Sequence, residues 1–376
     1  MVEIKVVGTK KELREFLSFP TRLYHNNPYA VPDLYREECD YFNPQKNPAY
    51  EYCETRLFLA YENGRVVGRV AAILNKKYNA KCGEARMRFS RFDVEENFEA
   101  AKALIEAVED FARKKGMNII HGPIGFSDLD KQGMLVEGFD LPDTSITLYN
   151  EPYYPQFLER LGYAKEADWI EFQLRPSDET TQRLERLSKK VCSMFGVRVL
   201  RTKKLSDIKP YVDDIFALIN NAYGKLYGYT PLTKKMQQYY YDEYFSLLNF
   251  DYVCICVDRE NKLAGFGLAF PSIAGALKKS NGRLFPFGFA RVLHDLKHAD
   301  VLELALIAVR SDLIGKGVNA VLVNHVNKSV LKNGVKRVET GPQLETNMEI
   351  QKQWKKICTD IKQHKRRRCY AKRLDA

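Results

Sequence analysis

The chain has 376 residues, 45% of them hydrophobic and 28% charged, which is the composition of an ordinary globular protein. This length is more than one hydrophobic core usually requires, and it suits two domains. No stretch of about 18 apolar residues occurs, which excludes a transmembrane helix. Residues 1–7 read as a strand rather than as a signal peptide, so we expect a cytoplasmic protein.

The formal net charge is +11, and the eight cysteines are scattered without a CxxC pair. A basic balance favours anionic partners, such as a nucleotide-bearing cofactor, nucleic acid or an anionic membrane surface. Cys254 and Cys256 lie two apart in an apolar segment, where cysteine usually behaves as a small core residue. We therefore expect neither a metal site nor a disulfide framework.

Patterning in the first half predicts alternating strands and helices. Asn63-Gly64 separates two apolar runs, which indicates a hairpin, and apolar residues recur at helical spacing between residues 97 and 115. After the N-terminal strand, the expected elements are a helix over 10–17, an irregular Pro-rich segment over 26–47, the hairpin over 57–74, a strand over 85–92, the helix over 97–115, a strand over 117–121, an irregular segment to about 150, a helix over 154–161 and a strand over 167–174.

The second half repeats this order. After a connecting helix over 179–195 and a strand over 197–201, the expected elements are a helix over 208–223, a Tyr-rich helix over 234–248, a hairpin over 252–270, a strand over 301–309, a helix over 316–332, a strand over 335–339 and a final strand over 367–374. A repeat of half the chain length indicates a duplicated domain. We therefore expect a layered α/β fold with mixed central sheets flanked by helices, divided into domains 1–175 and 176–376, with an insertion over 272–300.

The turn after the fourth strand distinguishes the two halves. In the second half the next helix begins at Gly315-Lys316-Gly317-Val318, whereas the corresponding turn of the first half, 92–97, is acidic and has no glycine. Glycines let backbone N–H groups approach an anion closely, and a helix N-terminus carries a partial positive charge. The pattern favours a phosphate site in the second half alone, with a simple turn as the alternative.

The order of elements and this turn resemble the GNAT superfamily of acyl-CoA-dependent N-acyltransferases, in tandem. The family pattern is roughly V-x-P-x-x-[RQ]-x-x-G-x-[GA], and the chain matches it at Val309 and Gly317. It departs from the pattern at Ser311, Ile314 and Asn319, while residues 315–318 match the common Gly-Lys-Gly-Ile variant.

Longer segments resemble a group of two-domain bacterial GNAT-like proteins to which the bacterial ceramide-forming N-acyltransferases are similar. The segments that carry this resemblance are 67–69, 122–123, 126–127, 133–139, 150–154, 282–287 and 344–348.

The resemblance implies direct attack of an amine on the thioester of acetyl-CoA or another acyl-CoA, whose phosphates the turn at 315–318 would bind. Backbone N–H groups near Ala308 and Val309 would stabilise the oxyanion. The attacking amine must lose a proton, so a carboxylate is needed as base, and Glu303 matches the position of the usual GNAT base. A glutamate on an edge strand facing water is the alternative for Glu303.

Other polar residues follow the fifth strand of the second half. Glu339, Glu345 and Asn347 could share the role of base or bind an amino-alcohol acceptor, with a solvated loop as the alternative. Tyr370 is a candidate acid for the departing thiolate, with core packing as the alternative. The basic run 365–368 could hold a CoA phosphate or nucleic acid, or form a solvated face.

The insertion alternates bulky apolar and cationic residues over 277–298. Such a mixture suits contact with an anionic membrane surface at the inner membrane face, or a lid over an apolar cleft, and both favour a lipid-like substrate. A helix that packs between domains is the alternative.

The features together predict an acyl-CoA-dependent N-acyltransferase. The second domain would transfer the acyl group to a small-molecule or lipid-like amine, and the first would be a degenerate scaffold that closes one wall of the cleft. A binding protein that kept the fold and lost the chemistry is the second hypothesis. A nucleic-acid-binding protein is the third, but it rests on charge alone, because no recognised nucleic-acid motif is present.

Overall fold

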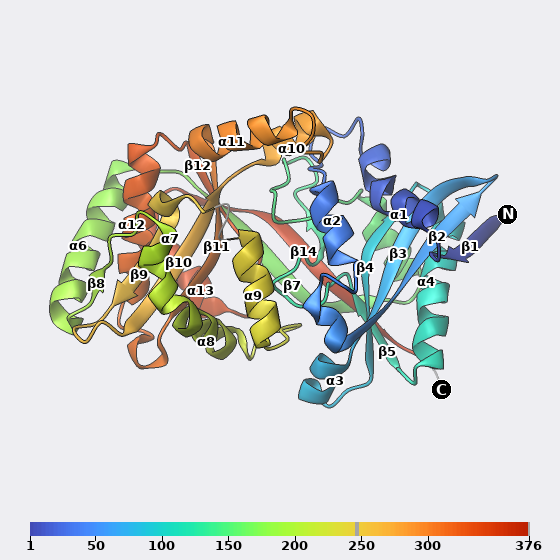
Figure 1. Ribbon diagram of the computed structural model, residues 1–376, viewed down its shortest axis with the longest axis horizontal. Helices are drawn as coiled ribbons and strands as arrows, with labels where there is room; N and C mark the ends of the chain where they lie inside the picture. Colours follow the sequence, from blue (N-terminus) through green and yellow to red (C-terminus); the bar gives the residue numbers. More distant parts are fainter. Residues whose placement is uncertain (245–247, 375–376) are drawn as a thin grey trace.

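The computed structural model describes residues 1–244 and 248–374. Its two lobes lie side by side around one continuous mixed sheet of 14 strands (Figure 1). The order along the sheet is β1-β2-β3-β4-β5-β14-β7-β12-β11-β10-β9-β8, and β6 and β13 pair off this path with β14 and β7. The expected α/β architecture with a mixed sheet flanked by helices is confirmed.

The first half forms the elements that its patterning predicts, with shifted bounds and a few additions. They are β1 (Val2–Val6), α1 (Lys10–Leu23), α2 (Tyr35–Tyr41), η1 (Pro48–Glu51), β2 (Cys53–Glu62), β3 (Arg65–Asn75), α3 (Lys76–Cys82), β4 (Arg86–Val94), α4 (Phe98–Lys114), β5 (Ile119–Gly122), β6 (Met134–Glu137), α5 (Tyr153–Arg160) and β7 (Ala164–Leu174).

The second half repeats the plan after a connecting helix. Its elements are α6 (Asp178–Phe195), β8 (Arg198–Val199), α7 (Leu205–Ile208), η2 (Lys209–Tyr211), α8 (Val212–Tyr223), α9 (Lys234–Tyr244), η4 (Phe250–Tyr252), β9 (Val253–Val257), β10 (Leu263–Pro271), α10 (Ala274–Ser280), α11 (Gly288–His298), β11 (Val301–Val309), η5 (Ser311–Leu313), α12 (Val318–Lys332), β12 (Arg337–Thr340), β13 (Gln343–Leu344), α13 (Met348–Ile357) and β14 (Ile361–Arg373). The expected Tyr-rich helix ends at Tyr244 as α9, and residues 245–247 of that prediction lie outside the described residues.

Helix α1 continues past Pro20, where the sequence predicted that it would already have ended. A proline inside a helix leaves the carbonyl four residues earlier without its N–H donor. Here that carbonyl belongs to Phe16, and it accepts a hydrogen bond of 2.9 Å from Nη1 of Arg69, which is buried in β3. A side chain from the sheet therefore replaces the missing backbone donor.

The two halves exchange their last strands. β14, the end of the chain, lies between β5 and β7 of the first half, with Tyr370 opposite Gly122 on one side and Trp169 opposite Arg367 on the other. β7 in turn pairs with β12 of the second half through Leu174 and Val338. The division at residue 175 stays a prediction, but each lobe's sheet contains a strand from the other half of the chain.

The basic run in β14 is not a solvated face. Lys365 and Arg367 are at most 1% exposed, and the Arg367 guanidinium pairs with Asp143 at 2.7 Å and with Glu171 at 2.5 Å. On the opposite face of the strand, Arg368 pairs with the buried Asp168 at 2.8 Å. The charges of this run therefore form ion pairs that hold β14 against β7 and the loop that contains Asp143.

Candidate functional site

β11 and β12 separate in the middle of the second lobe. They pair in parallel only from Val301 opposite Arg337 to Leu304 opposite Thr340, after which β12 ends while β11 continues to Val309. Ala305 is the extra residue of a bulge, because Leu304 and Leu306 pair with consecutive residues of β10. The result is an opening in the sheet beside the last five residues of β11.

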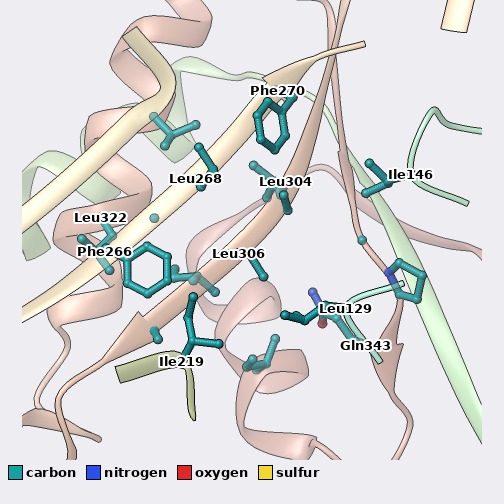
Figure 2. A pocket seen from close by; sticks show the side chains of 18 of the residues that line it. Leu129, Ile146, Ile219, Phe266, Leu268, Phe270, Leu304, Leu306, Leu322 and Gln343 are labelled. Carbon is teal, nitrogen blue, oxygen red and sulfur yellow. The ribbon is translucent and has the colours of Figure 1, made fainter. Parts of the chain in front are cut away.

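A cavity of about 1060 Å³ occupies this opening and extends on both sides of it. Figure 2 shows that its walls are mostly aliphatic and aromatic, with side chains from β10, β11, α8, α12 and the loops of the first half. The labelled lining residues are Leu129, Ile146, Ile219, Phe266, Leu268, Phe270, Leu304, Leu306, Leu322 and Gln343. A cavity of this size and polarity is suited to a large apolar ligand with few polar groups.

The open edge of β11 carries backbone groups that β12 does not satisfy. The hydroxyl of Tyr223, at the end of α8, donates to the carbonyl of Ile307 at 3.0 Å and accepts from its N–H at 3.2 Å. Along a strand, the backbone N–H groups of successive residues point to opposite sides. The N–H of Arg310 donates to the Ala264 carbonyl of β10, so the N–H of Ala308 also points toward β10. The N–H of Val309, between them, therefore points toward the opening. Of the two predicted oxyanion donors, Val309 is the one directed toward the cavity.

The predicted phosphate turn lies at one end of the cavity. Gly315, Gly317 and Val318 line the cavity, and both glycines have left-handed backbone conformations, with φ of 76° and 84°. No described side chain caps α12, and its first turn has no acidic residue. Lys316 is exposed beside it, with Nζ 5.6 Å from the centre of the Phe195 ring. An uncapped helix N-terminus next to a lysine can bind an anion.

The corresponding position in the first half offers no such site. The side chain of Asn97 caps α4 by accepting from the N–H of Ala100 at 3.1 Å, and Glu99 lies in its first turn. The opening between β4 and β5 is also filled by a loop of the second half. There Tyr227 bonds to Nδ1 of the buried His121 at 2.6 Å, and the Gly228 carbonyl accepts from Arg88 at 2.9 Å.

Glu303 lies in the wall behind the cavity. It is fully buried, and its carboxylate accepts from the N–H of Ser145 at 3.1 and 3.2 Å and from the hydroxyls of Ser145 and Ser272. Burial raises its pKa, against the lowering effect of these hydrogen bonds. The alternative of a glutamate facing water is wrong, but Ser145 and not Glu303 reaches the cavity surface.

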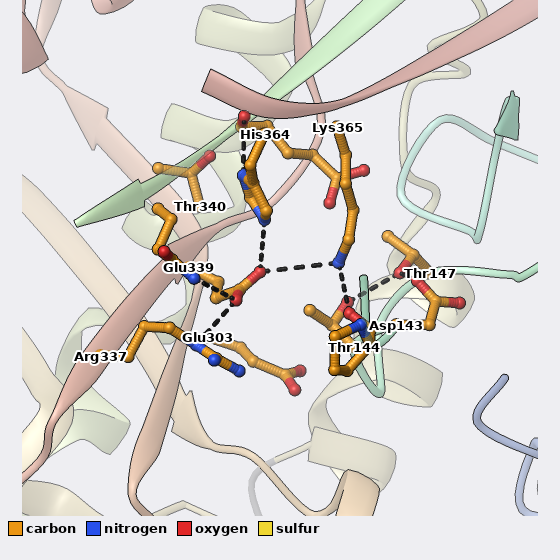
Figure 3. Close-up of polar contacts among 12 residues, drawn as sticks. Asp143, Thr144, Thr147, Glu303, Arg337, Glu339, Thr340, His364 and Lys365 are labelled. Atoms are coloured by element: carbon orange, nitrogen blue, oxygen red, sulfur yellow. Dashed lines mark hydrogen bonds and ion pairs between the residues drawn. The ribbon is translucent and has the colours of Figure 1, made fainter. Parts of the chain in front are cut away.

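Glu339 belongs to a buried ion-pair network (Figure 3). Its carboxylate lies 2.7 Å from Nε2 of His364, 3.7 Å from Nζ of Lys365 and 2.9 Å from Nε of Arg337. Burial alone would raise its pKa, but the hydrogen bond from His364 and the charge of Lys365 lower it to about 2. A carboxylate with such a low pKa is a weak base, and Glu339 is used to join β12 to β14.

The remaining predicted residues are not brought together. Glu345 is ion-paired with Lys165 at 2.5 Å and with Arg366 at 3.0 Å, and Asn347 lines the cavity at the start of α13. Tyr370 packs in the core of the first lobe, 1% exposed, and donates to Glu159 at 3.1 Å. The structure therefore separates Tyr370 from the opening between β11 and β12.

The structure adds carboxylates that the sequence did not single out. Asp128, Glu37 and Glu243 line the cavity where it meets the first lobe, close to the Tyr-rich helix α9. Burial raises the pKa of Asp128 and of Glu37 to about 7 and that of Glu243 to about 8. A carboxyl group whose pKa lies near neutrality can accept a proton from a bound ammonium group.

No sequence pattern marks Asp128, because it lies in an irregular loop of the half that the sequence predicts to be degenerate. It directly follows Phe126-Ser127, a segment that resembles related proteins but carries no acid–base motif. Its charge acts on Tyr223 of the second half only because the two halves pack together, and a sequence does not show such packing.

Two further findings concern the whole chain. Among residues 1–244 and 248–374, no group of three or more His, Cys, Asp or Glu side chains is arranged to hold a metal ion. None of the helices in the described segments is both long and apolar enough to span a membrane.

The chain resembles two curated bacterial proteins, while no protein-family model matches it. It is 26% identical over 378 residues to Protein YghO of Escherichia coli (strain K12), covering 99% of this chain and 95% of that protein. It is 28% identical over 293 residues to the bacterial ceramide synthase of Caulobacter vibrioides (strain NA1000 / CB15N), covering 77% and 75% of the two chains.

Solved structures share its fold over the full length. A tandem GNAT protein from the clavulanic acid biosynthesis pathway aligns with a TM-score of 0.59 at 14% identity, covering 100% of this chain and 99% of that one. A GCN5-related N-acetyltransferase from Sphaerobacter thermophilus aligns with a TM-score of 0.50 at 10% identity, covering 100% and 96%. The chain therefore has the fold of a tandem GNAT protein, as its sequence predicts.

Proposed function

We propose that the chain transfers an acyl group from an acyl-CoA thioester to an amine in the cavity of the second lobe. The observation that carries this proposal is the opening between β11 and β12. It connects the uncapped N-terminus of α12, which suits the phosphates of CoA, with a large apolar cavity, which suits an acyl chain.

The size of the cavity supports a long-chain substrate. About 1060 Å³ of mostly apolar space exceeds what an acetyl group and a small amine need. One relative is a bacterial ceramide synthase, which supports a long-chain amino alcohol as the acceptor to test first. Palmitoyl-CoA is the corresponding acyl donor to test.

Three groups on the cavity wall supply the chemistry of the proposed reaction. Asp128 accepts the proton that the attacking amine loses, because its pKa of about 7 lets it be ionised at neutral pH. The N–H of Val309 stabilises the charge that develops on the thioester oxygen. Tyr223, whose pKa burial raises to about 12, stays protonated at neutral pH. Its hydroxyl proton, which the Ile307 carbonyl accepts in the structure, passes to the departing sulfur and is then replaced from solvent.

Binding of CoA is the first test. We expect calorimetric titration to detect binding of CoA, acetyl-CoA and palmitoyl-CoA, with the strongest binding for palmitoyl-CoA. Lys316→Glu should weaken binding of all three about tenfold, roughly 1.4 kcal/mol, because a negative charge then faces the phosphates. Lys328→Glu is the matched control, since Lys328 is an exposed lysine near the other end of α12.

Acyl transfer is the second test, followed by release of free thiol with palmitoyl-CoA and either a long-chain amino alcohol or a short amine. Transfer to the long-chain acceptor supports the proposal. Tight CoA binding without transfer to any amine would favour a binding protein that has kept the fold. If the chain binds none of the thioesters, the proposal is wrong.

A further inference from the structure

The insertion between β10 and β11 has two different faces. In Figure 1 its helices α10 and α11 run along one edge of the molecule, from the second lobe toward the first. The inner face packs tightly: the Gly282 carbonyl accepts from the N–H of Tyr35 at 2.9 Å, and Leu277 is buried against Val31 and Leu34. Through this inner face the insertion packs against the first half, which is the alternative that the sequence left open for it.

The outer face carries a cluster of exposed aromatic side chains. Phe285 and Phe287 are 76% and 70% exposed, and Phe289 and Leu293 are 48% and 50% exposed. Thirteen large hydrophobic side chains are exposed in the described part of the chain, and these four, which include every exposed phenylalanine, fall within nine residues. We call Phe285, Phe287, Phe289 and Leu293 the aromatic edge.

Exposed cationic side chains lie in the same segment as the aromatic edge. Lys279, Arg283, Arg291 and Lys297 are all exposed. The one acidic residue between residues 274 and 299 is Asp295, and its carboxylate is directed inward, where it accepts from the N–H of Ala276 at 2.8 Å. The surface therefore combines apolar tips with positive charge, and the other acid of the insertion, Asp300, is paired with Lys336 at 3.1 Å.

We propose that the aromatic edge docks onto an anionic lipid bilayer. Aromatic side chains insert at the boundary between headgroups and acyl chains, while lysine and arginine interact with anionic headgroups. The positive charge around the edge selects this occupant over a second copy of the chain, whose identical edge would bring like charges together. The site differs from the cavity and does not depend on the proposed acyl transfer.

The same insertion forms part of the cavity wall. Ile273, Leu277 and Leu296 line the cavity from α10, α11 and the residues before α10. Docking through the outer face therefore holds one wall of the apolar cavity against the lipid surface. A lipid-like substrate could then enter from the bilayer without crossing water.

Sedimentation with lipid vesicles tests the proposal. The full chain should bind vesicles of phosphatidylcholine containing phosphatidylglycerol at least tenfold more strongly than vesicles of phosphatidylcholine alone. Phe285→Ser combined with Phe287→Ser should lower that binding at least tenfold. Lys279→Glu combined with Lys297→Glu should abolish the preference for the anionic vesicles, and raised salt should have the same effect.

The control replaces two exposed apolar residues elsewhere, Met194→Ser with Leu331→Ser, which are 58% and 44% exposed on α6 and α12. It should bind vesicles like the original chain. Thermal unfolding and calorimetric binding of CoA without vesicles should be unchanged in the phenylalanine variant, which separates this test from that of the proposed function.

Two results would overturn the proposal. One is equal vesicle binding by the original chain and the phenylalanine variant, or none by either. The other is a concentration-dependent dimer that the phenylalanine substitutions dissociate, without vesicle binding, because the edge would then be an interface between copies.

Discussion

At the scale of single residues, Asp128 is a candidate for the base of the proposed reaction beside Glu303. Sequence resemblance directs attention to Glu303, but that side chain is buried behind the cavity wall among serine donors. Asp128 lies on the wall itself, and burial raises its pKa to about 7. The two residues can be distinguished by how the rate depends on pH.

Asp128→Asn should lower kcat by about 10²- to 10⁴-fold, because the amide cannot accept a proton. In the original chain kcat should rise with pH, reach half of its maximum near pH 7 and level off above that, since the base acts when ionised. The measurement is initial acyl-transfer rate from pH 5 to 9. If Glu303→Gln removes activity while Asp128→Asn leaves the pH profile intact, Glu303 is the base.

The same substitution should stabilise the fold in a defined pH range. A carboxyl group with a raised pKa destabilises the folded state as pH increases from its ordinary value, 3.8, to its folded value, about 7. The Tm of Asp128→Asn should therefore exceed that of the original chain by an amount that grows from pH 5 to pH 7 and is constant above. A difference independent of pH would show that Asp128 keeps an ordinary pKa.

Tyr223→Phe should lower kcat by about 10²-fold, because the departing sulfur loses its proton donor. The hydrogen bonds to Ile307 are also lost, so we expect a destabilisation of about 1–3 kcal/mol. Tyr229→Phe is the control, since its hydroxyl bonds to Asn220 at 2.6 Å and is not part of the cavity wall. If Tyr229→Phe loses a similar amount of stability but keeps full activity, the loss of activity in Tyr223→Phe is not caused by destabilisation.

At the scale of elements, the sequence predicted most helices and strands because their patterns are local. α4 follows the predicted apolar spacing, the first hairpin turns at Asn63-Gly64, and β11 has the predicted bounds. Charged β14 was harder to interpret, because a run of basic residues normally faces water. Its burial depends on Asp143, Glu171 and Asp168, which come from distant parts of the chain.

Arg367→Met should destabilise the fold by about 3–5 kcal/mol, because it leaves the buried Asp143 and Glu171 without their cation. Arg368→Met should have a smaller effect, since Asp168 keeps its contacts with Arg366 and Lys165. Chemical denaturation of both variants measures the difference. An equal decrease in the free energy of unfolding of both variants would mean that the ion pairs on the two faces of β14 stabilise the fold equally.

At the scale of the whole molecule, the two halves are not separable pieces. The sequence predicted a duplication and a division at residue 175, because repeated patterns reveal copies. It did not predict that the last strands exchange, because strand pairing between copies leaves no local pattern. The cavity follows from the same packing, since loops of the first half form part of its wall.

Residues 1–175 alone should therefore fail to show a cooperative unfolding transition, because β5 and β7 lose the strand that lies between them. Co-expression with residues 176–376 should restore one transition for both pieces. Circular dichroism during thermal unfolding is the measurement. A stable, cooperative fragment 1–175 would show that β5 and β7 can pair directly.

The exchanged strand also sets the order in which the protein can be completed during synthesis. Residues 361–373 are synthesised after every other strand of the sheet, so β5 and β7 each keep one unpaired edge until β14 has been made. A premature stop shortly before β14 would therefore leave a gap in the sheet between β5 and β7. The sheet becomes continuous across both lobes only when β14 pairs with both of these strands.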